Sequence, residues 1–394
     1  MTDQNIKGPD TGATQAESPM AMALAGLAAL AVAMGIGRFA FTPVLPMMLQ
    51  DAGLTIASGA WLASFNYLGY LIGALSAMTL RVRPEHAIRG GLVAIGIATI
   101  GMGFSLPLAA WLLLRLIAGA ASAWVLISVS AWSLEALAVY RRPFLNSVVF
   151  AGVGSGIAAA GLLCLALTMS NAQSASAWIA LGLLAAGVTA LIWRSFTPSA
   201  RAGDARQSIS TFRWNADAIR LVCCYGVFGF GYIIPATFLP VMAKSALPGS
   251  AAFGWSWPVF GLAAALSTLA VAALVRRMSN RCLWAGSQWI MAIGIALPAW
   301  SPQFLTIFAA ALCVGGTFMV ITLVALQEAR HVAGRNATTL MAAMTSAFAG
   351  GQIIGPLTVR AGGNAGFSTG LTIAAILLAG ATLLLRKSAT ISRS

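Results

Sequence analysis

Two arginines lie inside long apolar stretches of the sequence, Arg38 near the middle of one and Arg115 within another. A charge in the bilayer interior costs about 2.5 to 3.5 kcal/mol on insertion scales, so such a residue by default marks a functional site. The guanidinium group is a planar fork of donors that matches a carboxylate or phosphate and stays charged at any relevant pH. The predicted chemistry is therefore the binding of a small organic anion, or of a zwitterion through its carboxylate.

No acidic side chain lies deep in any apolar run. The nine acids fall in tails, loops or the ends of runs: Asp3, Asp10, Glu17, Asp51, Glu85, Glu135, Asp204, Asp217 and Glu328. Both arginines thus lack a buried acidic partner, which leaves their charge for a ligand. A structural role, in which the guanidinium binds carbonyls or polar groups of neighbouring helices, stays open for each of them.

Uncharged polar side chains also lie at mid-depth in other runs. They are Asn66, Tyr67, Tyr70, Tyr232, Gln288 and Gln352. Of these, Asn66, Tyr232 and Gln352 are predicted to contact the cargo together with Arg38 and Arg115. The alternative for each is a hydrogen bond that joins neighbouring helices.

Membrane-spanning helices must position these residues. The chain is 59% hydrophobic and 8% charged, whereas a soluble protein carries about 25% charged residues. A spanning helix needs about 20 apolar residues, and its backbone N–H and C=O groups form hydrogen bonds with one another within the helix. Twelve such runs predict an all-α integral membrane protein with twelve transmembrane helices. Their limits are 20–50, 54–80, 87–106, 108–136, 145–169, 176–193, 218–244, 252–275, 283–300, 303–327, 338–359 and 367–385.

The sequence repeats itself across its middle. Gly35–Arg38 and Leu45–Met48 have counterparts in Gly229–Tyr232 and Leu239–Met242, each 194 residues later, and the same offset carries Trp61 onto Trp255. Such repeats predict two pseudo-symmetric six-helix bundles. The predicted parts are an N-terminal tail (1–19), a first bundle (20–193), a linker (194–217), a second bundle (218–385) and a C-terminal tail (386–394).

The basic residues predict the orientation. The net charge is +14, and 19 of the 23 Lys and Arg residues fall in the tails and in the loops on the side of the termini. By the positive-inside rule both termini are cytoplasmic. The expected partners of these loops are anionic lipid headgroups at the inner face, not nucleic acid.

Glutamate is followed seven positions later by arginine at two related places. Glu135 precedes Arg142 and Glu328 precedes Arg335, at the cytoplasmic ends of the fourth and tenth predicted helices. Their symmetric placement favours a gating role, the closing of the inner face by ion pairs. The alternative is that these four residues are ordinary charged residues at the membrane–water interface with no gating role.

Signatures of other protein classes are missing from the sequence. It contains no Gly-x4-Gly-Lys-Ser/Thr motif for nucleotides and no metal-ligand spacing, and its only histidines, His86 and His331, lie in inner loops. We therefore expect neither an enzyme nor a bound cofactor or metal.

On these residues the chain resembles the major facilitator superfamily, from about Met20 to Leu385. Leu113–Gly119 resembles that superfamily's Arg-and-Gly motif on helix four, and the doubled Glu-x6-Arg resembles an element of sugar porters. Gly351–Pro356 resembles the antiporter motif, although on helix eleven instead of helix five. Met34–Pro46 is most similar to the YbfB/YjiJ-like branch.

The resemblance implies a monomeric secondary active transporter in a bacterial inner membrane. It would move a small-molecule substrate, here a carboxylate-type anion or zwitterion, by alternating access coupled to a proton or counter-ion. Helices one, four, seven and ten would line the central cavity. Proton-driven efflux of drugs or hydrophobic metabolites is the alternative, and a non-transporting membrane sensor is a remote one.

Overall fold

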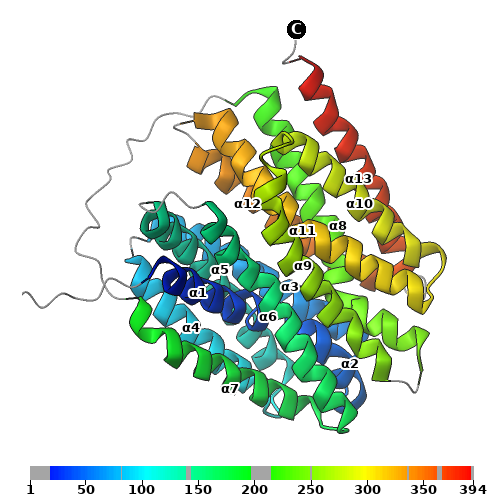
Figure 1. The fold of residues 1–394 in the computed structure, drawn as a ribbon. Coiled ribbons are helices and arrows are strands. Elements are labelled where there is room, and N and C mark those ends of the chain that lie inside the picture. Colours follow the sequence, from blue (N-terminus) through cyan, green and yellow to red (C-terminus); the bar gives the residue numbers. More distant parts are fainter. Residues whose placement is uncertain are drawn as a thin grey trace, which may run out of the picture.

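The computed structural model describes residues 18–80, 82–138, 143–196, 214–248, 251–334, 337–361 and 366–391, and these residues form helices joined by short connections (Figure 1). The first helices are α1 (Pro19–Leu30), the π-helix η1 (Ala31–Ile36), α2 (Phe41–Asp51), α3 (Ile56–Thr79), α4 (Pro84–Gly101), α5 (Leu108–Ala138), α6 (Pro143–Met169), α7 (Ser174–Ile192) and η2 (Trp193–Ser195). The later ones are α8 (Ala216–Ala246), η3 (Ala251–Trp255), α9 (Ser256–Leu274), α10 (Asn280–Trp300), α11 (Phe304–Ala333), α12 (Ala337–Ala361) and α13 (Gly366–Ile391).

Ten of the predicted spans are confirmed among the described residues as helices long and apolar enough to cross a membrane. The segment Pro19–Asp51, which contains α1, η1 and α2, counts as one of them. The two long helices outside this set are α3 and α4. The first turns of α4 carry Glu85, His86 and Arg89, and the middle of α3 carries Asn66 and two tyrosines, which lowers the mean hydropathy of both helices.

The helices form two groups that meet along a long interface. Helices α1 to α7 contact one another, and so do α8 to α13. The two groups lie at lower left and upper right in Figure 1. Across the interface α6 packs on α9, α3 on α12, and α2 on α8. The predicted limits of the two bundles stay a prediction.

Glycines allow the helix backbones to approach closely, as is common in membrane proteins. A Cβ atom at Gly119 of α5 would collide with the carbonyl oxygen of Asn66 on α3. In the glycine run of α6, a Cβ at Gly152 would collide with the Leu27 oxygen of α1, whereas one at Gly154 would collide with the Ala265 nitrogen of α9. The run therefore serves two contacts, one within the first group and one between the groups.

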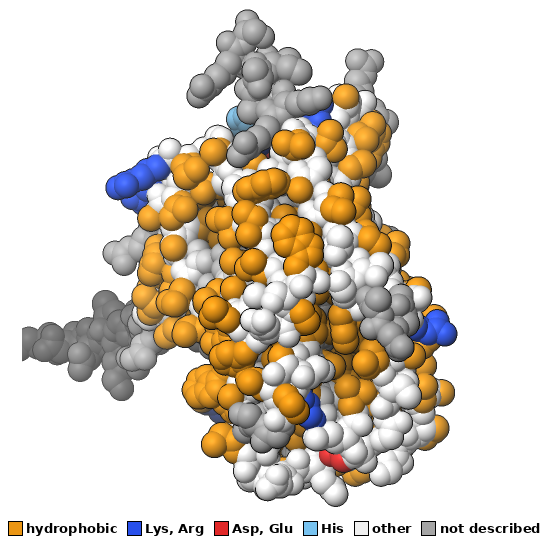
Figure 2. Space-filling view, turned by 90° about the vertical axis from the view of Figure 1, so that its right-hand side faces the viewer, with side chains coloured by type: hydrophobic (Ala, Val, Ile, Leu, Met, Phe, Trp, Pro, Cys, Tyr) orange, Lys and Arg blue, Asp and Glu red, His pale blue; other side chains and the backbone are white. Residues whose placement is uncertain are grey.

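Large apolar side chains cover much of the surface, as a hydrocarbon environment requires. Figure 2 shows hydrophobic side chains spread over one face, with few Lys and Arg residues. Leu191 is 83% exposed and Trp300 is 84% exposed. Trp61 and Trp255, which the repeat relates, are 38% and 50% exposed.

We expect Gly154→Leu to lower the melting temperature of the purified protein by several degrees, because overpacking costs about 1 to 3 kcal/mol. The added side chain would collide with the α9 backbone and force the two groups apart. Gly380→Leu on α13 is the matched control, since a Cβ there meets no atom within 4 Å. Equal melting temperatures for the two variants would contradict the close contact of α6 and α9.

Candidate functional site

The first membrane segment is broken at the depth where Arg38 lies. The amide of Gly37 donates to the Val32 oxygen at 2.9 Å and that of Phe39 to the Met34 oxygen at 3.0 Å, both of them i to i−5 hydrogen bonds of a π-helix. A turn at residues 37–40 then leads into α2. A Cβ at Gly37 would lie 2.7 Å from the Ser122 hydroxyl oxygen of α5, so the close approach of this segment to α5 requires a residue without a side chain.

Arg115 and Asn66 bind the backbone exposed at this break. Arg115 donates from Nη2 to the Arg38 carbonyl oxygen at 3.0 Å and from Nη1 to that of Gly37 at 3.4 Å. Asn66 donates from Nδ2 to the Gly37 oxygen at 3.3 Å and to the Arg115 oxygen at 2.9 Å. Both side chains are buried. Since carbonyls freed by a helix break must be satisfied in a membrane, both residues stabilise the shape of the first segment.

Arg38, Gln352 and Tyr232 form a chain of hydrogen bonds across the interface between the two groups. Arg38 donates from Nη2 to the Gln352 side-chain oxygen of α12, and Gln352 donates from Nε2 to the Tyr232 hydroxyl of α8. All three side chains are at most 2% exposed. Three of the five residues predicted to bind the cargo thus meet at one point, while Arg115 and Asn66 lie beside it.

The Arg38 guanidinium is held among aromatic rings. Its Cζ lies 3.8 Å from the centre of the Tyr70 ring and 5.4 Å from the centres of the Tyr67 and Phe39 rings, within the range of cation–π attraction. Its Nε and Nη1 atoms have no hydrogen-bond partner among the described residues. Two donor nitrogens of a buried cation are therefore available for an acceptor such as a carboxylate or phosphate oxygen.

A cluster of aromatic side chains continues from the site into the second group of helices. Tyr232 stacks on Phe318 with ring centres 5.7 Å apart and on Phe348 with ring centres 5.5 Å apart. Phe228 and Tyr225 extend the stack along α8. Sequence reasoning missed this cluster. Its signal was the spacing of three and four residues between Tyr225, Phe228 and Tyr232, which puts the three rings on one helix face.

Hydrogen bonds join the two groups on the side of the site where α2 ends. The Thr42 hydroxyl donates to the Ala236 oxygen at 2.7 Å, and Ala236 is the repeat partner of Thr42. Tyr67 and Thr237 share a hydrogen bond of 3.0 Å between their hydroxyls. Lys244 donates to the Pro46 oxygen at 3.1 Å. The groups therefore contact each other directly between the site and the C-terminal end of α2.

The predicted gating residues are described only in part. Arg142, Arg335 and the side chain of Glu135 lie outside the described residues. Glu328 is buried and pairs with Arg281 of α10 at 2.5 Å, and Arg281 also pairs with Asp217 of α8 at 2.5 Å. The described pairs of Glu328 thus join helices of the second group. Arg281 was not predicted as a partner, and the gating role stays a prediction.

Gln288 holds two helices of the second group together. It accepts from the Trp284 indole at 2.8 Å and donates to the Leu378 oxygen of α13 at 3.1 Å, so it joins α10 to α13 and lies apart from the chain of Arg38. Among the described residues, no group of three or more His, Cys, Asp or Glu side chains could hold a metal ion.

Comparison with known proteins places the chain among transporters. A family model described as "Uncharacterised MFS-type transporter YbfB" matches residues 30–391. No curated protein gives a match. Among solved structures, the crystal structure of a point mutant of the nucleoside transporter NupG is similar, with a TM-score of 0.70 and 16% sequence identity over 93% of this chain and 99% of that one. At this identity the likeness shows the fold.

Proposed function

The chain belongs to the family of MFS-type transporters that includes YbfB, and from this premise we propose that it moves a small organic anion or zwitterion across the membrane with Arg38 as the main cargo-binding residue. It is a membrane transporter and not an enzyme.

The observation that carries the proposal is the chain Arg38–Gln352–Tyr232. It joins side chains from both groups of helices, and the donors that Arg38 leaves free suit a carboxylate. A cargo that bound these donors would contact both groups at once. Its binding would then change with any movement of one group against the other, which is what alternating access requires.

We infer the following transport cycle, which this arrangement supports. Residues 20–193 and 218–385 rock as two bundles of six spans each, with α3 and α4 completing the twelve. The hydrogen bonds Thr42–Ala236 and Tyr67–Thr237 break when the site opens toward the end of α2. Ion pairs of Glu135, Arg142, Glu328 and Arg335 then close the opposite, cytoplasmic face. A proton or a counter-ion supplies the energy, and the basic inner loops meet anionic lipids of a bacterial inner membrane.

The aromatic cluster favours a second candidate function, the efflux of hydrophobic metabolites or drugs. Rings such as Phe318 and Phe348 stack on Tyr232 beside Arg38 and could contact an apolar cargo. Such a cargo does not need a buried cation. Dependence of binding on Arg38 therefore separates the two functions.

A thermal-shift screen of the purified protein in detergent tests the proposal. Wild type and Arg38→Gln are heated with carboxylates, amino acids, phosphorylated metabolites, lipophilic drugs and, because of the NupG fold likeness, nucleosides. A ligand at 100 times its dissociation constant stabilises by about 2.7 kcal/mol. We expect an anion to stabilise wild type and not the variant. Stabilisation of both by drugs alone would instead support efflux.

A further inference from the structure

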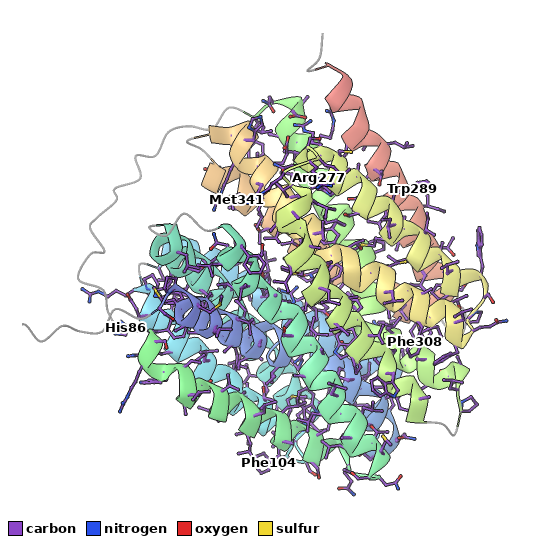
Figure 3. All side chains as sticks on the ribbon, in the orientation of Figure 1. His86, Phe104, Arg277, Trp289, Phe308 and Met341 are labelled. Carbon is purple, nitrogen blue, oxygen red and sulfur yellow. The ribbon has the colours of Figure 1, made fainter. Side chains whose placement is uncertain are left out.

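A groove of about 740 Å³ runs between α4 and α7 on the outside of the first group of helices, where Figure 1 shows the two helices side by side. The helices touch closely at one end, where a Cβ at Gly182 would collide with Ile100 and one at Gly103 would lie 2.7 Å from Ile179 Cγ1. At its other end the groove opens beside Trp193 and Arg194. In Figure 3, His86 lies in the first turn of α4 and Phe104 lies just beyond its C-terminal end.

The groove is apolar and opens to the membrane. Gly96 lies on its wall, and a Cβ there would meet no atom within 4 Å. Its rims are exposed hydrocarbon: Ile97 is 65% exposed and Leu191 is 83% exposed. In a membrane-spanning chain, the medium around such side chains is lipid. An acyl chain is therefore the group that can fill this space.

The length of the groove matches one leaflet. Its α4 wall runs from Leu92 to Ile100, and eight residues of helix rise about 12 Å. One leaflet contributes about 15 Å of a hydrocarbon core that is about 30 Å thick. The groove therefore suits a lipid from a single leaflet.

Two arginines lie at the open end of the groove. Arg194 lines it. Arg89 donates from Nε and Nη2 to the Trp193 carbonyl oxygen at 3.1 and 2.8 Å, and its Cζ lies 5.0 Å from the centre of the Trp193 ring. Trp193 itself lines the groove. Tryptophan and basic residues at this depth meet lipid headgroups, and basic pockets between helices bind anionic ones. The charged neighbours at the start of α4 are its N-cap residue Arg83 and, within the helix, Glu85 and His86, of which the acid is buried.

We propose that this groove is a binding site for one anionic phospholipid, whose acyl chain lies between α4 and α7 and whose phosphate contacts Arg194 and Arg89. The site is separate from the cargo site and goes beyond the proposed transport function. It differs from a general lipid annulus because shape, length and charge coincide at one place.

Native mass spectrometry and thermal shift in detergent micelles doped with phosphatidylglycerol or, in parallel, phosphatidylcholine test this site. Gly96→Trp fills the groove, and Gly187→Trp is its matched control, because Gly187 on α7 also has open space around it but does not line the groove. Arg194→Gln removes the charge, and Arg277→Gln removes an exposed arginine elsewhere.

We expect wild type and both controls to retain one phosphatidylglycerol, Gly96→Trp to bind it about tenfold more weakly, and Arg194→Gln to bind it about fivefold more weakly. Soluble glycerol phosphate, added as a third probe, should not stabilise the protein. Equal binding by Gly96→Trp and Gly187→Trp would overturn the proposal. So would equal affinity of wild type for phosphatidylcholine, which would mean that no anionic headgroup is recognised, or stabilisation by glycerol phosphate that Gly96→Trp leaves unchanged.

Discussion

Transport by the Arg38→Lys protein is expected to fall by about 100-fold, although lysine keeps the positive charge. Arg38 donates from Nη2 to Gln352, and its Nε and Nη1 atoms are free to donate to the cargo. The compact ammonium group of lysine lacks this planar fork and cannot reproduce both sets of contacts. Hydrogen bonds to charged groups are each worth about 1.5 to 3 kcal/mol, so the loss of two accounts for the effect. Flux of the cargo found by thermal shift, measured in proteoliposomes, gives the result.

Arg277→Lys is the matched control for this prediction, since Arg277 is exposed and lies outside the site. The melting temperatures of both variants should stay close to that of wild type. Transport by Arg38→Lys at the wild-type rate would remove the guanidinium from the cargo site. Because Tyr70, Tyr67 and Phe39 surround either cation, a difference in aromatic contact alone would not explain a large loss.

The helices follow the sequence pattern closely where hydrophobicity sets their limits. The predicted span 145–169 corresponds to α6 (Pro143–Met169), and 108–136 to α5 (Leu108–Ala138). The span 303–327 ends earlier than α11, which continues to Ala333. Hydrophobicity marks only the part of a helix in hydrocarbon. The extra turns of α11 carry Glu328, whose buried ion pair with Arg281 no apolar count can detect.

The sequence predicted how deep in the membrane the site residues lie, but it did not predict which of them bind one another. Apolar context placed Arg38, Tyr232 and Gln352 at the middle of their helices, and they meet there. The sequence put Arg38 nearer the middle of its span and gave it a polar repeat partner, Tyr232, but it could not show that Arg115 binds the backbone that carries Arg38. That contact depends on the π-helix before Gly37, which frees backbone carbonyls on one side of the first segment. The change from i to i−4 to i to i−5 backbone hydrogen bonds in a π-helix leaves no periodic pattern of hydrophobic residues in the sequence.

The break also explains why two buried arginines can lie so close together. Arg115 binds the carbonyl oxygen of Arg38 itself, so the dipoles of the broken helix accept one cation while the side chain of the other points toward Gln352 and Tyr70. One arginine thus supports the backbone that carries the other. Loss of Arg115 should therefore lower stability, whereas loss of Arg38 should abolish transport without lowering stability.

Arg115→Leu is expected to lower the free energy of unfolding by about 3 kcal/mol, because it leaves the buried carbonyls of Gly37 and Arg38 without their charged donor. The yield of folded protein in membranes and its melting temperature in detergent measure the loss. Arg38→Leu is the matched comparison. It removes a buried cation with two unpartnered donors and keeps the hydrogen bond between Gln352 and Tyr232.

We expect Arg38→Leu to melt at or above the wild-type temperature and to be inactive in transport, since functional sites often carry groups that reduce stability. If both leucine variants lost stability equally, Arg38 would be a structural residue and the cargo would have to bind elsewhere. If Arg115→Leu kept wild-type stability, Asn66, which also donates to the Gly37 oxygen, would suffice to hold the break. The free arginine would then be Arg115, and its guanidinium would join that of Arg38 in binding the cargo.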